Sequence, residues 1–201
     1  MMNEFSRRKF LGTGGAALAA ATVTTPAMAL TEAAARRLVD QVVADINRVI
    51  SSGKSLGGMI SDFERIFRSY ADVNIIARST LGADSRRASP AQLRAYTDAF
   101  RGYIARKYGK RFREFQGGEI TVRSVRRARS WQEVISTVKL PGKQPFEVKF
   151  LVSDKSGSDK FFDMIIEGIS LRLTERDEIG AMLDQRGGDI NALISDIKRA
   201  G

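Results

Sequence analysis

The 201-residue sequence contains neither cysteine nor histidine. Without cysteine there is no disulfide framework, no thiol nucleophile and no thiolate metal site. Without histidine the chain lacks the usual general base near neutral pH and the commonest metal ligand. These absences exclude zinc chemistry and catalysis by Ser-His-Asp or Cys-His groups. For the chain as a whole we expect no catalytic residues, no metal and no cofactor, with an enzyme that uses carboxylates in a cavity as an alternative.

The sequence also lacks an apolar run long enough to form a membrane-spanning helix. A basic stretch at 7–9 precedes a weakly apolar, glycine-rich stretch at 12–23, and the small residues Ala27 and Ala29 follow. This order is typical of a signal peptide, and the paired arginines resemble a twin-arginine signal. A transmembrane anchor is the alternative, but the apolar run is too short for one. We predict that 1–29 is a twin-arginine-type signal peptide, cleaved after Ala29 on export to a bacterial periplasm.

Positive charge is concentrated in one segment of the remaining chain. Residues 101–129 contain ten arginines and lysines against two glutamates, whereas the rest of 30–201 is neutral. The stretch 101–115 alternates basic with aromatic residues, which is typical of a surface for nucleic acid or another polyanion. Nucleic acid is scarce in a periplasm, so we keep a polyanion-binding protein as an alternative and expect no nucleic-acid partner.

The hydrophobic pattern predicts helices, then a sheet, then further helices. Apolar residues at helical spacing predict the first helices over about 33–50, 56–70, 72–82 and 90–112. Alternating residues predict an antiparallel meander of four strands over 119–125, 133–140, 146–152 and 161–173. Start signals then predict helices over about 174–187 and 189–198. The fold class is therefore α+β, in one domain at 30–201.

The helix predicted at 90–112 begins with a capping box at Ser89-Pro90-Ala91-Gln92 and carries a broad aromatic stripe. On these features alone the stripe favours ordinary core packing, and the alternative is the wall of an apolar cavity between helix and sheet. The pattern alone does not separate the two. Lys107 and Arg111 project within the same stripe, where they would stand at the rim of such a cavity. Cations also favour a helix C-terminus for electrostatic reasons, which is the alternative explanation.

Three stretches, 72–82, 88–112 and 162–197, resemble the MlaC family of toluene-tolerance periplasmic proteins. The most specific match is Asp163 followed by the run Glu167-Gly168-Ile169-Ser170-Leu171. The resemblance implies an NTF2-like architecture, in which helices pack around a curved four-stranded antiparallel sheet. It also implies a periplasmic phospholipid carrier, not an enzyme, that holds acyl chains in an apolar cavity.

The same resemblance implies partners. Lipid would be exchanged with an outer-membrane lipoprotein complex and with an inner-membrane ABC transporter that carries an MCE-domain ring, which maintains outer-membrane lipid asymmetry. We expect a monomer whose cargo is a phospholipid and which makes at most transient contact with a membrane surface. Family members commonly open the last long strand with a tryptophan; this chain has Asp159 near that position.

The resemblance and the strand alternation together assign a lipid-binding cavity. Its predicted lining is apolar and comprises Phe63, Phe67, Ile76, Tyr96, Phe100, Tyr103, Ile104, Tyr108, Phe112, Val134, Val138, Val148, Phe150, Val152, Ile165 and Ile169. Lys107 and Arg111 are the predicted head-group rim. Asp163 and Glu167 are spaced to share a strand face, as in cavity enzymes of related fold. No third catalytic partner is visible, so we expect a structural role, through ion pairing with a basic neighbour or turn capping.

Overall fold

The computed structural model describes residues 30–201, except for the side chains of residues 112 and 113. The predicted signal peptide at 1–29, with its cleavage site at Ala29, lies outside the described residues. The described elements are α1 (Glu32–Ile50), α2 (Leu56–Tyr70), α3 (Val73–Leu81), η1 (Gly82–Arg86), α4 (Pro90–Gly109), η2 (Lys110–Phe115), β1 (Glu119–Ala128), β2 (Trp131–Lys139), β3 (Phe146–Ser153), β4 (Lys160–Ile166), β5 (Ile169–Ser170), α5 (Leu171–Asp184) and α6 (Ile190–Arg199). Of the helices in this range, none has the length and hydrophobicity that crossing a bilayer requires.

The strands form one antiparallel sheet in the order β1-β2-β3-β4-β5, which confirms the predicted α+β class and meander. The prediction of a single last strand at 161–173 is wrong. The backbone of Glu167 and Gly168 has φ values of 48° and 85°. Two successive positive φ values make the tight turn of a two-residue hairpin, so the chain reverses and Ile169 pairs with Ile166. The sheet therefore has a short fifth strand.

The same reversal moves the start of the next helix. Helix α5 begins at Leu171, three residues before the predicted start, because Ser170 caps it. The Ser170 hydroxyl accepts a hydrogen bond from the Leu173 amide at 3.1 Å. Strand and helix are thus joined without a loop, and α5 begins beside the edge of the sheet.

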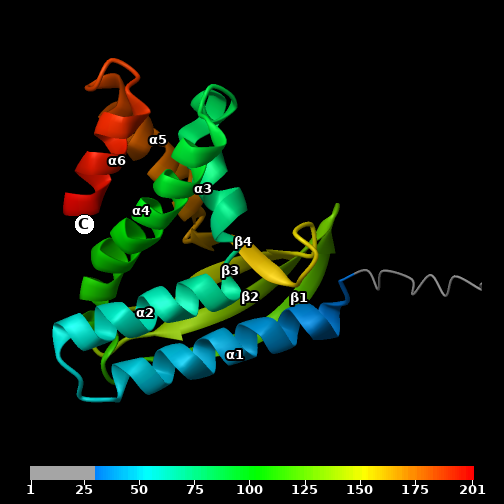
Figure 1. The fold of residues 1–201 in the computed structure, drawn as a ribbon. Helices are drawn as coiled ribbons and strands as arrows, with labels where there is room; N and C mark the ends of the chain where they lie inside the picture. Colours follow the sequence, from blue (N-terminus) through cyan, green and yellow to red (C-terminus); the bar gives the residue numbers. More distant parts are fainter. Residues whose placement is uncertain (1–29) are drawn as a thin grey trace, which may run out of the picture.

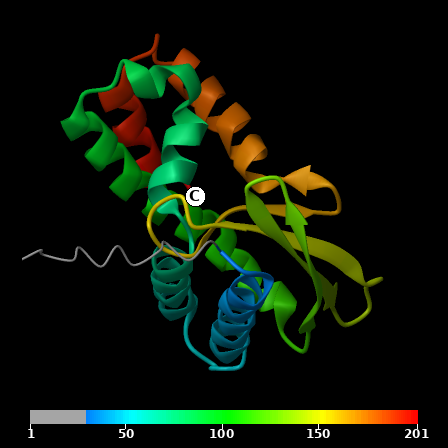
Figure 2. The same cartoon turned by 90° about the vertical axis from the view of Figure 1, so that its right-hand side faces the viewer.

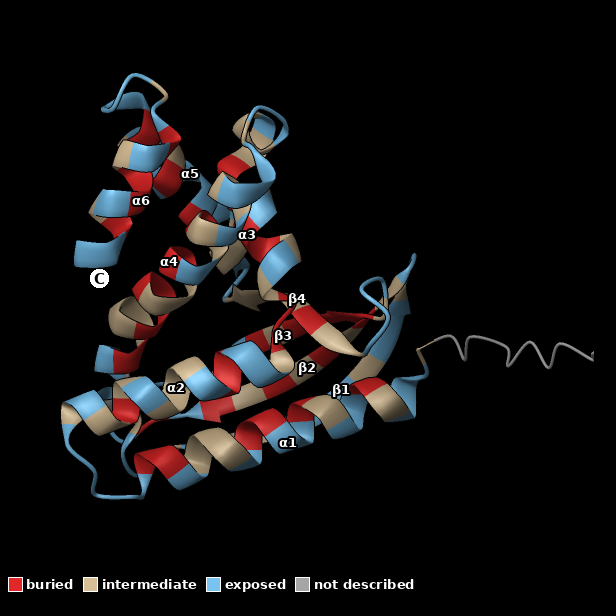
Figure 3. Ribbon diagram, in the orientation of Figure 1, coloured by how far each residue is buried: buried red, intermediate tan, exposed pale blue. Residues whose placement is uncertain are grey.

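The helices form two groups around the sheet. Figure 1 shows α1 and α2 lying along the sheet, while α3, α5 and α6 gather beyond it. Figure 2 separates these groups, with α1 and α2 below and the others above. Helix α4 connects the groups, since it packs against both α2 and α6. Figure 3 shows buried residues along β2, β3 and α4, so the hydrophobic core lies between sheet and helices.

The start of α4 has the predicted capping box. The Ser89 hydroxyl accepts from the Gln92 amide at 3.1 Å, and the Gln92 side-chain oxygen accepts from the Ser89 amide at 2.9 Å. Pro90 occupies the first helical turn, where its missing N–H costs nothing. These contacts fix where the longest helix of the described chain begins, and hence which of its residues face the sheet.

Replacing Ser89 with alanine should lower the free energy of unfolding by about 1 kcal/mol, because one terminal amide of α4 loses its acceptor. Urea denaturation followed by circular dichroism measures the change. Ser156→Ala, in the exposed turn between β3 and β4, is the matched control and should leave the midpoint unchanged. Equal midpoints for both variants would show that the box contributes nothing.

Candidate functional site

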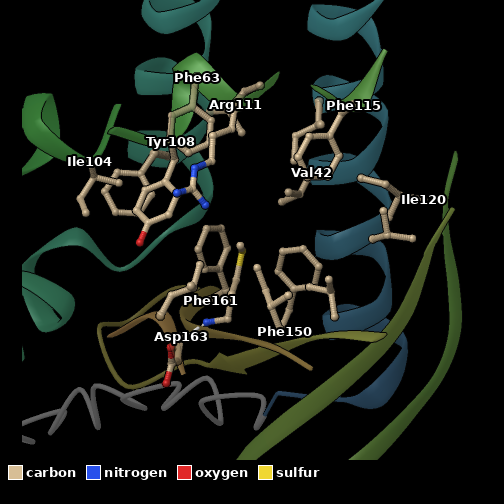
Figure 4. A pocket seen from close by; sticks show the side chains of 18 of the residues that line it. Val42, Phe63, Ile104, Tyr108, Arg111, Phe115, Ile120, Phe150, Phe161 and Asp163 are labelled. Atoms are coloured by element: carbon tan, nitrogen blue, oxygen red, sulfur yellow. Dashed lines mark hydrogen bonds between the residues drawn. The ribbon is translucent and has the colours of Figure 1, made fainter. Parts of the chain in front are cut away.

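A cavity of about 500 Å³ lies between the sheet and the helices α1, α2 and α4. Figure 4 shows Phe150 and Phe161 on one side of it, with Val42, Phe63 and Ile104 contributed by helices. Its wall is predominantly aromatic and aliphatic. A cavity of this size and character matches the concave apolar sites that hold small molecules and lipids, roughly 300–1,000 Å³. The space between helix and sheet is therefore hollow and not a filled core.

Most of the predicted lining residues meet at this cavity. Those that line it are Phe63, Phe67, Ile76, Phe100, Ile104, Tyr108, Val138, Val148, Phe150 and the predicted rim residue Arg111. Figure 4 shows the Arg111 side chain beside that of Tyr108. Their contact with a lipid stays a prediction.

Four predicted residues pack in the core instead of lining the cavity. Tyr96, Tyr103, Val134 and Val152 are each at most 2% exposed and are absent from the cavity wall. Tyr96 is held there because its hydroxyl hydrogen-bonds the Thr80 hydroxyl at 2.8 Å. The aromatic stripe of α4 is therefore divided, since one part fills the core and another part lines the cavity.

Strand pairing explains why Ile165 does not line the cavity. Met164 and Ile166 lie opposite the cavity residues Phe150 and Val148, so they share that face of the sheet. Ile165 lies opposite Lys149 and points to the other face. The prediction for Ile165 was wrong because a bulge in β4 changes the alternation.

Ile169 also lies outside the cavity, contrary to the prediction, and its side chain is 63% exposed. It follows the tight turn at Glu167-Gly168, which carries the chain past the cavity before β5 begins. Phe112 lies in η2, and its side chain is outside the described part of the chain.

Sequence reasoning missed much of the wall. The missed apolar residues include Val42 and Ile46 on α1, Phe115, Ile120, and Phe161, Met164 and Ile166 on β4. Val42 and Ile46 are one helical turn apart on the apolar face of α1, so that periodic face was an available signal. The residues of β4 required knowledge of its bulge and register.

The exposed residues of the wall mark the mouth of the cavity. They come from η2 (Arg111 and Glu114), the β2–β3 loop (Lys143 and Gln144) and the β4–β5 turn (Glu167). The turn is anchored beside the start of β3 by the Glu167 amide, which donates to a β3 backbone carbonyl at 3.1 Å. Loop, turn and η2 together surround an opening that carries both signs of charge.

A buried carboxylate joins α4 to α5 at the cavity wall. Glu175 is 2% exposed and accepts hydrogen bonds from the Lys107 ammonium at 2.8 Å and from the Tyr108 hydroxyl at 2.5 Å. Lys107 also pairs with Glu178, which accepts from the Tyr103 hydroxyl at 2.7 Å. The prediction that Lys107 stands at the rim is wrong, because its ammonium is held by these two carboxylates.

The charges of this cluster stabilise one another. Burial opposes the charge on Lys107, but hydrogen bonds to Glu175 and Glu178 outweigh burial and raise its pKa. Burial likewise opposes ionisation of Glu178, yet Lys107 and Tyr103 lower its pKa. The pKa values of Tyr103 and Tyr108 are raised by burial and by the adjacent carboxylates, so both hydroxyls remain donors.

Asp163 lies in the cavity wall, where neighbouring groups hold its carboxylate. It is 4% exposed and accepts from the Ser170 hydroxyl at 2.6 Å, the Met164 amide at 2.8 Å and the Arg172 amide at 3.1 Å. The Arg172 guanidinium lies 3.5 Å away as an ion-pair partner. Glu167 is exposed in the turn and does not share a strand face with Asp163, so the two carboxylates form no acid–base pair. Within residues 30–201, no cluster of three or more acidic side chains is placed to hold a metal ion.

Replacing Lys107 with methionine should destabilise the protein by about 2 kcal/mol, because Glu175 loses its cation while remaining buried. The loss is below the ~3–5 kcal/mol of a fully buried pair, since the Lys107 side chain is 23% exposed. Urea denaturation of Lys107→Met measures it, with Lys198→Met on the exposed face of α6 as the matched control.

The effect of Lys107→Met should depend on pH. A raised lysine pKa gives stability that is complete below its ordinary value of 10.5 and is lost as pH rises through the folded value. A lowered glutamate pKa gives stability that is present above 4.5 and is lost as pH falls through the folded value. The difference from wild type should therefore be largest near neutral pH and shrink toward both limits, because at acid pH the variant can protonate its buried carboxyl groups. A difference that stayed the same below pH 4.5 and above pH 10.5 would contradict the ion-pair account.

Comparison with known proteins agrees with this geometry. A family model described as MlaC protein matches residues 36–199. A solved structure of the phospholipid-binding protein from Ralstonia solanacearum, in complex with a phospholipid, superposes with a TM-score of 0.71 at 21% sequence identity. The match covers 82% of this chain and 95% of that chain.

Proposed function

Because the chain belongs to the MlaC family, we propose that it is a periplasmic phospholipid carrier whose cavity holds acyl chains. The single observation that carries the proposal is the apolar cavity of about 500 Å³ between helices and sheet. The Ralstonia solanacearum protein of similar fold is in complex with a phospholipid, which supports the same type of ligand here. The carrier makes and breaks no covalent bond, and its work is to bind, shield and release.

The acyl chains should supply nearly all of the affinity. Each buried methylene contributes about 0.8 kcal/mol, whereas an ion pair at a wet rim contributes ~0–1 kcal/mol. At the mouth, Arg111 and Lys143 offer cations for a lipid phosphate, beside Glu114 and Glu167. This mixed rim provides weak attraction and little discrimination between head groups.

We propose the family's transport role for this protein. After export through a twin-arginine-type signal at 1–29, it would carry lipid between an outer-membrane lipoprotein complex and an inner-membrane ABC transporter with an MCE ring. This exchange maintains outer-membrane lipid asymmetry. Lipid transfer requires the mouth to meet a lipid surface. Two exposed apolar residues follow the β4–β5 turn that lines the mouth, Ile169 on β5 and Leu173 in the first turn of α5. They favour transient insertion among lipids during transfer.

The first test fills the cavity. Val148 lies on β3, is 5% exposed and lines the cavity. Val148→Trp should displace the volume of two or three methylenes and lower the affinity for phospholipid roughly 30-fold. Titration of the delipidated protein with phospholipid measures the affinity, lipid extraction and mass spectrometry of the purified protein give the occupancy, and circular dichroism verifies folding.

The neighbouring substitution Glu147→Trp is the matched control, since Glu147 is exposed on the opposite face of β3. It should retain wild-type lipid. A wild-type protein that purifies without phospholipid, or a folded Val148→Trp variant with wild-type affinity for it, would overturn the proposed function.

A second test separates binding from transfer. The double substitution Ile169→Ser and Leu173→Ser should slow lipid transfer to vesicles roughly tenfold, because less apolar area enters the lipid surface. Lipid occupancy should stay unchanged, since neither residue lines the cavity. A fluorescence-dequenching assay measures transfer. Equal transfer rates for the variant and wild type would remove these two residues from the docking step.

A further inference from the structure

A single residue ahead of α1 is held by two polar side chains of the sheet. The Leu30 amide donates to the Asp154 carboxylate at 3.0 Å, and the Leu30 carbonyl accepts from the Gln132 side-chain amide at 3.2 Å. Gln132 lies on β2, and Asp154 directly follows β3. The Leu30 side chain packs against the main core. The chain is thus fixed at Leu30 before the helix begins.

These groups surround a small polar pocket of about 70 Å³, whose wall also includes Arg127 and Trp131. Gln132 is 4% exposed, and its side-chain oxygen has no hydrogen-bond partner among the described residues. A buried acceptor without a donor is costly and unusual. A peptide amide at Leu30 has only one hydrogen, which Asp154 takes, so the pocket offers more acceptors than the amide can satisfy.

We propose that this pocket is a binding socket for the α-ammonium group of Leu30, which forms when the precursor is cleaved after Ala29. The inference rests on the proposed cleavage site. Hydrolysis by a signal peptidase breaks the bond between the Ala29 carbonyl carbon and the Leu30 nitrogen. Water supplies the oxygen of the new carboxylate on the signal peptide and the protons that convert the amide nitrogen to an ammonium.

Cleavage changes the chemistry of the socket without moving Leu30. The neutral hydrogen bond to Asp154 becomes an ion pair, which is the stronger contact. The ammonium has two additional hydrogens, one of which is available to the unpartnered Gln132 oxygen. Arg127 is the other charged residue in the wall and opposes the ammonium. Asp154 supplies the compensating negative charge.

The socket bears on the cavity because it lies next to α1. Helix α1 begins at Glu32, two residues after Leu30, and contributes Val42 and Ile46 to the cavity wall. An ammonium clamped between β2 and the end of β3 holds this helix on the sheet. The mature chain should therefore keep its cavity wall in place more firmly than the precursor does.

A thermodynamic cycle tests the socket. Four proteins are made, each beginning either at Leu30 or at Thr24, and each with Asp154 or with Asp154→Asn. In the Thr24 chains the terminal ammonium is six residues away from the socket. Starting at Leu30 should raise the folding equilibrium constant roughly tenfold with Asp154 present. In the Asp154→Asn background, starting at Leu30 should change the folding equilibrium constant less than about twofold.

The titration of the amine gives a second readout that a merely shortened chain would not change. With ¹⁵N-labelled Leu30, NMR should place the pKa of the terminal amine above its ordinary value of about 8, and Asp154→Asn should return it. The socket's stabilisation should be complete below pH ~8 and lost as pH rises through the raised value. Equal stability of the Leu30 and Thr24 chains, or an unshifted amine, would overturn the socket.

The socket and the lipid-carrier function are tested by different outcomes. Intact mass of the exported protein shows whether the chain begins at Leu30. A different first residue would overturn the socket while lipid occupancy stayed normal. If the exported protein begins at Leu30 and the stabilisation depends on Asp154 as expected, but no lipid is bound, the carrier function alone would be overturned.

Discussion

A carboxylate buried without its cation costs more than almost any single contact contributes, and Glu175 imposes this constraint on the structure. Its cation, Lys107, comes from α4, and its second donor, Tyr108, follows on the same helix. Helix α5 cannot separate from α4 without leaving that charge unpaired. Since α5 is joined directly to the β4–β5 hairpin through Ser170, the pairing also fixes one edge of the sheet and the wall residues beside it.

The need to pair charges also explains the role of the basic segment at 101–129. In the sequence it is a block of unbalanced positive charge, but in the fold its members on α4 find partners from other elements. Arg101 pairs with Glu64 on α2 at 2.9 Å, and Arg106 donates to the Ile197 carbonyl on α6 at 2.7 Å. The block therefore fastens α4 to the helices around it, which leaves less of it to act as a surface for a polyanion.

The features that could be predicted from the sequence are those set by residues close together in the chain. The capping box at Ser89 and the stripe of α4 depend on residues within a few turns of one another, so the sequence pattern contains them. The partner of Lys107 lies 68 residues away in the chain, and no helical projection identifies such a partner. Ile169 was misplaced because Glu-Gly is not among the commonest hairpin dipeptides, and the prediction therefore continued one strand from 161 to 173. Which residues of β4 line the cavity depends on how β4 pairs with β3. That pairing is set by tertiary packing and cannot be deduced from β4 alone.

The mouth of the cavity is built from a 3₁₀ helix, a loop and a two-residue turn, whereas its walls are regular helices and strands. Widening this opening breaks few of the backbone hydrogen bonds that hold the sheet and the α-helices together. The kinetic barrier to exchange of cargo and the thermodynamic stability of the fold are therefore set by different groups of residues. Such a separation leaves evolution free to adjust how quickly the protein loads and unloads without altering how firmly it is folded.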